Sequence, residues 1–160
     1  MLLISLLAEA VERAKTLYHR LVLVAGPAGS GKTPALRELA AQKGYGVLNV
    51  NFLLSQRMLE LTKAQRSRQV ERLLKELVDG GSTDVLVLDN LEILFDTNLR
   101  IDPLRLLQAA SRNRTLVAAW NGTVEDGTLT YAVPDHPEYR SYKNVAAIIV
   151  QCGQTASTTT

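Results

Sequence analysis

Five short, mostly apolar runs divide this chain, and each is bounded by polar residues or glycine. Runs of this length, rich in leucine and β-branched residues, favour buried strands over helices. A further stretch over 129–133 predicts one more short strand. The five main predicted strands cover residues 20–26, 46–51, 83–90, 115–121 and 145–151.

The segments between these runs carry apolar residues at helical spacing. Pro34 lies in the first turn of one predicted helix and Gly44 stops it, whereas Asp102 is an N-cap and Thr62 can break a longer helix. Strands that alternate with helices indicate an α/β fold with a mostly parallel sheet covered on both faces. The predicted helices cover residues 1–19, 32–43, 55–78 and 102–113.

Composition indicates an ordinary globular chain. The 160 residues are 46% hydrophobic and 21% charged, which suits one domain with a substantial core. We predict a single domain over 1–151, including the N-terminal helix over 1–19, and a disordered polar tail over 152–160. The net charge of +2 neither favours nor excludes nucleic acid as a partner.

Cysteine usage and hydropathy indicate the compartment. Cys152 is the single cysteine, so no internal disulfide forms, which suits a reducing environment. The N-terminal segment has no basic region before its apolar start, and no run approaches the roughly 20 apolar residues of a membrane span. We therefore expect a cytoplasmic protein without a membrane partner. The amphipathic N-terminal helix packs on the domain; contact with an oligomer partner or a membrane surface is the alternative.

The stretch after the first predicted strand, GPAGSGKT, matches the phosphate-binding pattern G-x-x-x-x-G-K-[ST]. In this pattern the glycines let backbone N–H groups surround phosphate oxygens, Lys32 faces the β- and γ-phosphates, and Thr33 offers a hydroxyl to Mg²⁺. A strand precedes the loop and a helix follows it, so the helix N-terminus adds partial positive charge. The predicted ATP-binding residues of the loop are Gly26, Pro27, Ala28, Gly29, Ser30, Gly31, Lys32 and Thr33.

A phosphate loop of this kind requires a second strand that ends in an acidic residue. The run VLVLDN supplies Asp89 in that position, followed by Asn90. A carboxylate there holds magnesium together with the hydroxyl of the loop. Asp89 and Asn90 therefore complete the predicted nucleotide site, with Thr33 and Asp89 as the Mg²⁺ ligands.

The order of these motifs resembles that of the AAA+ and related ATPases. The resemblance implies a three-layer P-loop NTPase fold whose five-stranded sheet has the order 5-1-4-3-2, here without a C-terminal helical lid. In that class an acid directly after the magnesium aspartate polarises the attacking water, whereas this chain has Asn90. An amide cannot accept a proton, so Glu92 is the candidate base. Alternatively, Glu92 only orients its neighbours.

Three more residues are candidates for catalysis. Asn121 ends the fourth predicted strand, where the same resemblance implies a polar group near the γ-phosphate; an Asn-Gly turn is the alternative. Arg112 and Arg114 precede this strand, and one of them can serve a neighbouring subunit as an arginine finger. The default interpretation of both arginines is an ordinary surface position.

Direct evidence for nucleic acid as a partner is weak. The predicted helix over 55–78 carries Lys63, Arg66, Arg68, Arg72 and Lys75, but glutamates are interleaved with them, which favours a solvated charged face. The stretch YAVPDHPEYRSYK places aromatic residues beside cations, which suits base stacking or a protein contact. DNA therefore remains one of several partners that the sequence allows.

The whole pattern resembles the BrxF family, the small P-loop proteins of BREX phage-defence systems. The resemblance runs from about Leu17 to Val150 and rests on GPAGSGKT, LDNLEILFD, SRNRTLVAAWNG and LTYAVPDHPEYRSY, in that order. It implies an ATP-binding accessory subunit that works with other BREX subunits to distinguish phage DNA from methylated host DNA. It also implies that Asn90 is a feature of the family.

Two main functional hypotheses follow. The first is an ATPase or ATP-driven switch that uses Mg²⁺ and assembles into homo-oligomers, because neighbouring chains must close a site without a lid. The second is a nucleotide-gated module that binds DNA or protein with little hydrolysis, which Asn90 motivates. A small-molecule kinase is a weaker third hypothesis, because the sequence offers no evident acceptor pocket.

Overall fold

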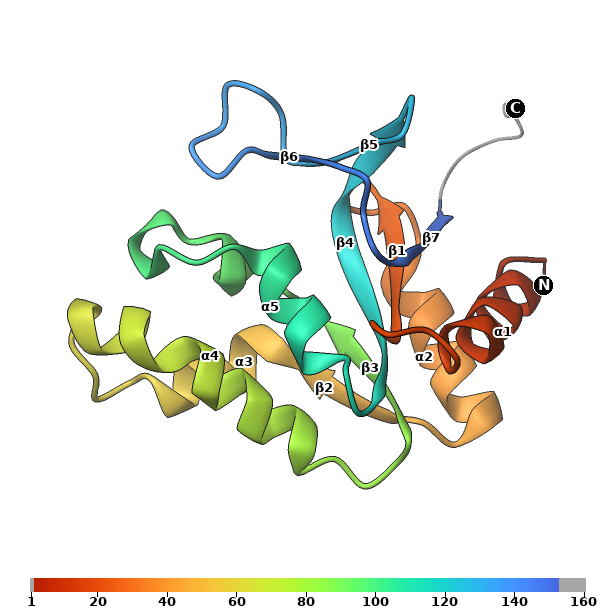
Figure 1. Cartoon of the computed structure of the whole chain (residues 1–160), viewed down its shortest axis with the longest axis horizontal. Coiled ribbons are helices and arrows are strands. Elements are labelled where there is room, and N and C mark those ends of the chain that lie inside the picture. The colour runs from red at the N-terminus through yellow and green to blue at the C-terminus, as the bar shows by residue number, and fades with distance from the viewer. Residues whose placement is uncertain (1, 153–160) are drawn as a thin grey trace.

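In the computed structural model, which describes residues 2–152, a mostly parallel sheet lies between two layers of helices (Figure 1). The order of the core strands is β2-β3-β4-β1-β7, and each neighbouring pair is parallel. With β7 counted as the fifth core strand, this is the predicted order 5-1-4-3-2. The P-loop NTPase fold is therefore confirmed. The core strands are β1 (Leu21–Gly26), β2 (Gly46–Asn49), β3 (Val85–Asp89), β4 (Thr115–Glu125) and β7 (Ile148–Gln151).

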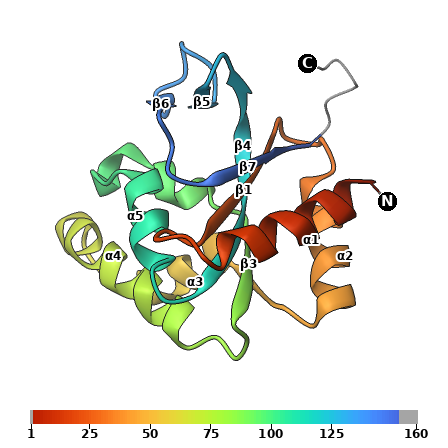
Figure 2. The same ribbon diagram turned by 45° about the vertical axis from the view of Figure 1, so that its right-hand side comes forward.

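The two helical layers are unequal (Figure 2). Two helices cover one face of the sheet, whereas three helices and two short 3-10 helices cover the other. The first layer consists of α1 (Leu2–Ala14) and α2 (Lys32–Lys43). The second consists of α3 (Val50–Arg57), α4 (Lys63–Asp79), η1 (Glu92–Phe95), η2 (Thr97–Leu99) and α5 (Pro103–Ala110).

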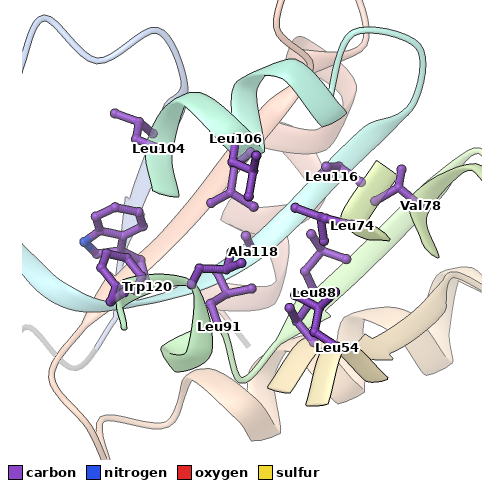
Figure 3. Packing of buried hydrophobic residues seen from close by; sticks show 14 of the residues in the cluster. Leu54, Leu74, Val78, Leu88, Leu91, Leu104, Leu106, Leu116, Ala118 and Trp120 are labelled. Carbon is purple, nitrogen blue, oxygen red and sulfur yellow. The ribbon is translucent and has the colours of Figure 1, made fainter. Parts of the chain in front are cut away.

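Leucines and valines on the central strands face opposite layers. In β3, Leu86 and Leu88 pack with the larger layer, whereas Val85 and Val87 pack against α1 and α2. Figure 3 shows Leu88 in the larger cluster, together with side chains from neighbouring strands and helices. Because both faces are buried, these strands show continuous apolar runs instead of polar alternation.

The helix boundaries differ from the predictions for local reasons. The long stretch does break near Thr62, whose side chain caps α4 and forms a reciprocal capping box with Gln65. The preceding helix begins earlier than predicted because the side chain of Asn49 accepts a hydrogen bond from the N–H of Phe52. The N-terminal helix ends at Ala14, and α5 ends at Ala110.

A β-hairpin extends from the end of β4 and was only partly predicted. Strand β4 continues to Glu125 and pairs with β5 (Thr128–Tyr131), which pairs with β6 (Arg140–Lys143). The turn lies at Asp126 and Gly127, so the predicted alternative of an Asn-Gly turn at Asn121 is wrong. Gly122 is needed instead because a β-carbon there would overlap the carbonyl of Thr130 on β5.

Aromatic side chains pack strands β5 and β6 against the rest of the domain. Trp120 is fully buried and donates its Nε1–H to the carbonyl oxygen of Thr130 at 2.9 Å. Tyr131 stacks on Phe95, with ring centroids 3.4 Å apart, and Tyr142 donates its hydroxyl to Asp102 at 3.0 Å. Tyr142 and Arg140, considered above for base stacking or a protein contact, therefore have structural partners; the guanidinium of Arg140 donates to the carbonyl of Ile101.

Cys152 is the last residue that the structure describes. This residue, which the predicted tail includes, is buried, and its N–H donates to the carbonyl of Ala25 at 2.7 Å. The rest of the predicted tail, 153–160, lies outside the described residues, as does Met1. Within residues 2–152, none of the helices combines the length and the hydrophobicity that crossing a bilayer requires.

Candidate nucleotide site

The phosphate loop lies between β1 and α2 and opens onto a cavity of about 340 Å³. Gly31, the N-cap of α2, has a φ of 99°, a left-handed conformation that favours glycine. The loop and the helix N-terminus therefore reach the cavity from the same side, which suits an anionic group. The residues around it are Ala28, Gly29, Gly31, Lys32, Thr33, Pro34, Asp89, Asn90, Glu92, Ala119 and Asn121.

Lys32 is held against the loop itself. Its ammonium group donates to the carbonyl oxygens of Gly26 and Pro27, both at 2.7 Å, and lies 3.4 Å from the hydroxyl of Ser30. Burial lowers the pKa of Lys32, whereas the negative charge of nearby acidic groups, including Glu92, opposes this shift. A phosphate entering the cavity would compete with the loop carbonyls for the ammonium group.

Thr33 and Asp89, the two predicted magnesium ligands, meet across the cavity. The Thr33 hydroxyl donates to Asp89 Oδ1 at 3.1 Å, and the N–H of Asn90 donates to the same oxygen at 3.0 Å. The described residues contain no cluster of three or more histidine, cysteine or acidic groups that could hold a metal alone. A magnesium ion here would therefore take its remaining ligands from water and phosphate oxygens, which is its usual preference.

Asn90 turns the chain directly after β3. Its φ of 57° is left-handed, a conformation that asparagine tolerates better than most residues, and its carbonyl accepts the N–H of Asn51 at 2.8 Å. The sharp turn brings the start of η1 to the cavity. Glu92, the first residue of η1, thereby lines the cavity two positions after Asn90.

Two side-chain amides, one on strand β4 and one in the first turn of α3, hold the Glu92 carboxylate. Asn121, on β4, donates its Nδ2–H to Glu92 Oε2 at 2.6 Å, and Asn51, which follows β2, donates to Oε1 at 2.9 Å. The Asn51 side-chain oxygen also accepts the N–H of Ile93 at 2.6 Å. Asn51 was not predicted as a site residue, although its position after an apolar strand resembles that of Asn90 and Asn121.

A second cavity, of about 510 Å³, adjoins the first and shares Ala28, Glu92 and Asn121 with it. Its other walls come from Pro27 and the hairpin, including Tyr131. Burial raises the pKa of Tyr131 to about 12, and the negative charge of Glu92 adds to the shift. An acceptor pocket was not evident from the sequence; this cavity lies beside the phosphate loop, whose Pro27 and Ala28 line it.

The two predicted arginines lie away from this cavity in their own chain. Arg112 and Arg114 precede β4. Asn121 lies six residues beyond Thr115, the first residue of β4, which is about 20 Å along the strand. The guanidinium of Arg112 packs 3.9 Å above the ring of Tyr18, and Arg114 donates to the carbonyl of Thr83. A catalytic role for either residue would therefore require a neighbouring copy.

Comparison with protein families gives one similarity by sequence. Residues 22–94, which include the phosphate loop and Asp89, are similar to the core domain of viral superfamily 1 RNA helicases. This segment is less than half of the chain. A comparison with curated proteins finds no match.

Three solved structures are similar over most of this chain. The replication initiator DnaA bound to AMPPCP and single-stranded DNA has 21% identity and a TM-score of 0.47, covering 94% of this chain and 44% of that one. AMPPCP-bound DnaA from Aquifex aeolicus has 20% identity and a TM-score of 0.42, with coverages of 76% and 40%. C. elegans PCH-2 has 17% identity and a TM-score of 0.46, with coverages of 94% and 42%.

This chain thus spans less than half the length of each of those three chains. The phosphate loop, the strand order and the helicase-like segment nevertheless agree with one another. The chain contains a P-loop nucleotide-binding domain of the ATPase type.

Proposed function

We propose that this chain binds Mg-ATP in the 340 Å³ cavity and hydrolyses it, as an accessory subunit of a BREX-type phage-defence system. The observation that carries the proposal is the meeting of Thr33 and Asp89 across the cavity, with Glu92 held beside them. A hydroxyl and a carboxylate oxygen are suitable donors for magnesium. When bound, the metal would stabilise negative charge on the phosphate oxygens.

In this proposal the side chains of the site have separate tasks. The loop N–H groups and Lys32 bind the terminal phosphates, and Thr33 with Asp89 holds the metal. Glu92 accepts the proton of the attacking water, because the amide side chain of Asn90 is not basic enough to accept it. Asn51 and Asn121 orient the carboxylate of Glu92. The BREX assignment is supported by the family resemblance described above.

Phosphate release by the purified chain tests the proposal, with Lys32→Ala as the inactive variant. We expect turnover in the presence of Mg²⁺, its loss on chelation, and its loss in Lys32→Ala. Lys43→Ala is the matched control, because Lys43 is an exposed lysine at the other end of the same helix. Turnover in Lys32→Ala equal to that of the unmodified chain would reject the site.

A nucleotide-gated module with little hydrolysis is the second candidate function. Two observations favour it: Asn90 replaces the usual acid, and both oxygens of Glu92 already accept hydrogen bonds from amides. The chain would then bind ATP and change its affinity for DNA or a partner protein without turnover. Tight ATP binding with negligible phosphate release, at high concentration and with DNA present, would select this alternative.

We also propose that nucleotide promotes assembly of identical chains. Arg112 is exposed and distant from its own cavity, so it is available to a neighbouring site in such an assembly. Sedimentation with and without ATP tests this proposal, and mixing Arg112→Ala with Glu92→Gln chains tests the shared site. A monomer under all conditions would reject it.

A further inference from the structure

A hollow of about 420 Å³ lies away from the nucleotide cavity, between the first turns of α4 and the end of η2. Three of its side chains are cations, and none is acidic. Within residues 2–152, the head groups of these three exposed cations have no ion-pair or hydrogen-bond partner. We call this site the basic hollow, and its residues are Lys63, Ala64, Ser67, Arg68, Asn98 and Arg100.

The other cations of the same helix are engaged within the chain: Arg66 donates its Nε–H to the carbonyl of Leu61 at 3.0 Å, and two more form ion pairs. Arg72 bonds to Glu76 at 2.6 Å, and Lys75 bonds to Asp79 at 3.0 Å, both at the i,i+4 spacing. The predicted solvated face with interleaved charges therefore describes the C-terminal half of α4. Its N-terminal half carries cations without compensation.

The wall of the basic hollow is held in place by backbone contacts. The Ser67 hydroxyl donates to the carbonyl of Leu99 at 2.7 Å, which ties α4 to η2. Arg100 follows at once with a left-handed φ of 54°, an uncommon conformation for arginine. The capped N-terminus of α4 adds partial positive charge at the Lys63 end.

A second hollow adjoins the basic hollow and differs from it in charge. A neighbouring hollow of about 380 Å³ shares Arg100 and adds the exposed Arg105 of α5. Its two acidic residues, Glu71 and Asp102, match these two cations in charge; Asp102 also caps α5 and accepts the Tyr142 hydroxyl. The uncompensated positive charge is therefore confined to the basic hollow, where three cations suit more than one phosphate group.

We propose that the basic hollow binds the phosphate backbone of a nucleic acid strand, without base specificity. Lysine and arginine are the principal phosphate ligands in such complexes, and the hollow presents three of them. It has no aromatic side chain among its six residues, so stacking on bases is not part of the contact.

The position of Arg100 also links this surface to the nucleotide site. The chain runs from Glu92 through η1 and η2 directly to Arg100. A nucleic acid strand bound to Arg100 would therefore affect the segment that places Glu92 in the cavity. Bound nucleic acid would then change the rate of hydrolysis. This coupling rests on the proposed ATPase function, whereas the binding itself does not.

Binding is tested by fluorescence anisotropy with a labelled oligothymidylate of about 20 nucleotides, without ATP. The double variant Arg68→Gln/Arg100→Asn should bind about tenfold more weakly at low salt. Asparagine tolerates the left-handed backbone at position 100. The slope of log affinity against log salt should decrease by about 1.4, because each lost phosphate contact contributes about 0.7 for a single strand.

The matched control is Arg72→Gln/Lys75→Gln, which removes the same amount of charge but from ion-paired positions of α4. It should keep the affinity and the salt slope of the unmodified chain. Equal losses in both double variants would show attraction by net charge alone and would overturn the proposal. Binding to vesicles of anionic lipid without binding to the oligonucleotide would also overturn it.

Phosphate release with and without the oligonucleotide tests the coupling. The oligonucleotide should change turnover of the unmodified chain and of the control pair, but not of Arg68→Gln/Arg100→Asn. Turnover that is unaffected by saturating oligonucleotide would reject the coupling and leave the binding result standing. Absence of turnover in every chain would reject the ATPase proposal instead, because anisotropy measures the basic hollow separately.

Discussion

The nucleotide cavity and the basic hollow both suit phosphate, but they are built in opposite ways. The cavity combines one buried cation, Lys32, with loop N–H groups and two carboxylates, Asp89 and Glu92. The hollow has three exposed cations and no carboxylate. In the cavity, positive charge must therefore come partly from a metal ion, whereas the hollow needs none.

This difference determines what each site can discriminate. Backbone amides and a metal position are fixed in space, so they recognise the shape of a terminal polyphosphate. Long exposed side chains bind negative charge over a range of geometries, and salt screens them strongly. The two sites should therefore respond to different perturbations, even though Glu92 and Arg100 belong to one continuous segment.

Glu92→Gln should produce the largest difference in effect between the two sites. The variant keeps the size of the side chain and removes the proton acceptor, so turnover should decrease by about 10²–10⁴-fold. ATP affinity should change less than about twofold if the role of Glu92 is chemical. Phosphate release and nucleotide binding, measured on the same preparation, check this prediction.

Oligonucleotide binding without ATP is the control for Glu92→Gln. It should be unchanged, because Glu92 lies outside the basic hollow. Turnover close to that of the unmodified chain would assign Glu92 a purely orienting role and favour another source of the base.

Gly122→Ala should loosen one side of the nucleotide cavity and leave the basic hollow intact. The new methyl group would overlap the carbonyl of Thr130, so β5 must move away from β4. Overpacking of this kind costs about 1–3 kcal/mol of unfolding free energy. Urea unfolding measures the loss, and Gly127→Asn, at a left-handed position with open space around it, is a milder control.

The local motifs were predictable, because each depends on contiguous residues. GPAGSGKT specifies the loop, and the apolar run before Asp89 specifies a buried strand that ends at the cavity. The strand order followed from the resemblance of the motif order to known ATPases. The break at Thr62 also followed from local chemistry, since a capping box is encoded within four residues.

The contacts between distant segments were not predictable from one sequence. Asn51 reaches Glu92 across forty-one positions, and Arg100 joins Arg68 only because η2 packs on α4. The Asn121-Gly122 pair shows the same limit. A turn was a reasonable local interpretation, but the close approach of β5 requires glycine within a continuing strand.

Salt should affect ligand affinity at the two sites differently, with a smaller contrast than the variants above. Three phosphate contacts in the basic hollow give a slope of about −2 for a single strand, so affinity should decrease about 20-fold between 50 and 200 mM salt. Over the same range of salt, the affinity of the partly enclosed cavity for Mg-ATP should decrease by a several-fold smaller factor. Parallel titrations with both ligands check this. Equal salt dependence would remove the distinction between a fixed and a flexible phosphate site.

Alkaline pH should give the smallest effect, confined to the hairpin beside the nucleotide cavity. Burial raises the pKa of Tyr131 to about 12, above its ordinary value of about 10. Between these values the unfolded chain releases the phenolic proton while the folded chain retains it, so stability decreases as pH rises. Burial beside Asp102 also raises the pKa of Tyr142, which adds to the decrease in the same direction.

Tyr131→Phe should therefore reduce the loss of unfolding free energy between about pH 10 and 12, because it removes one of these protons and keeps the ring stacked on Phe95. Urea unfolding at several pH values measures the change. Tyr18→Phe is the control, since Tyr18 is exposed, and it should leave the decrease unaltered. The same decrease in Tyr131→Phe as in the unmodified chain would mean that the hairpin opens to solvent before Tyr131 ionises, and the second cavity would then lack a fixed wall.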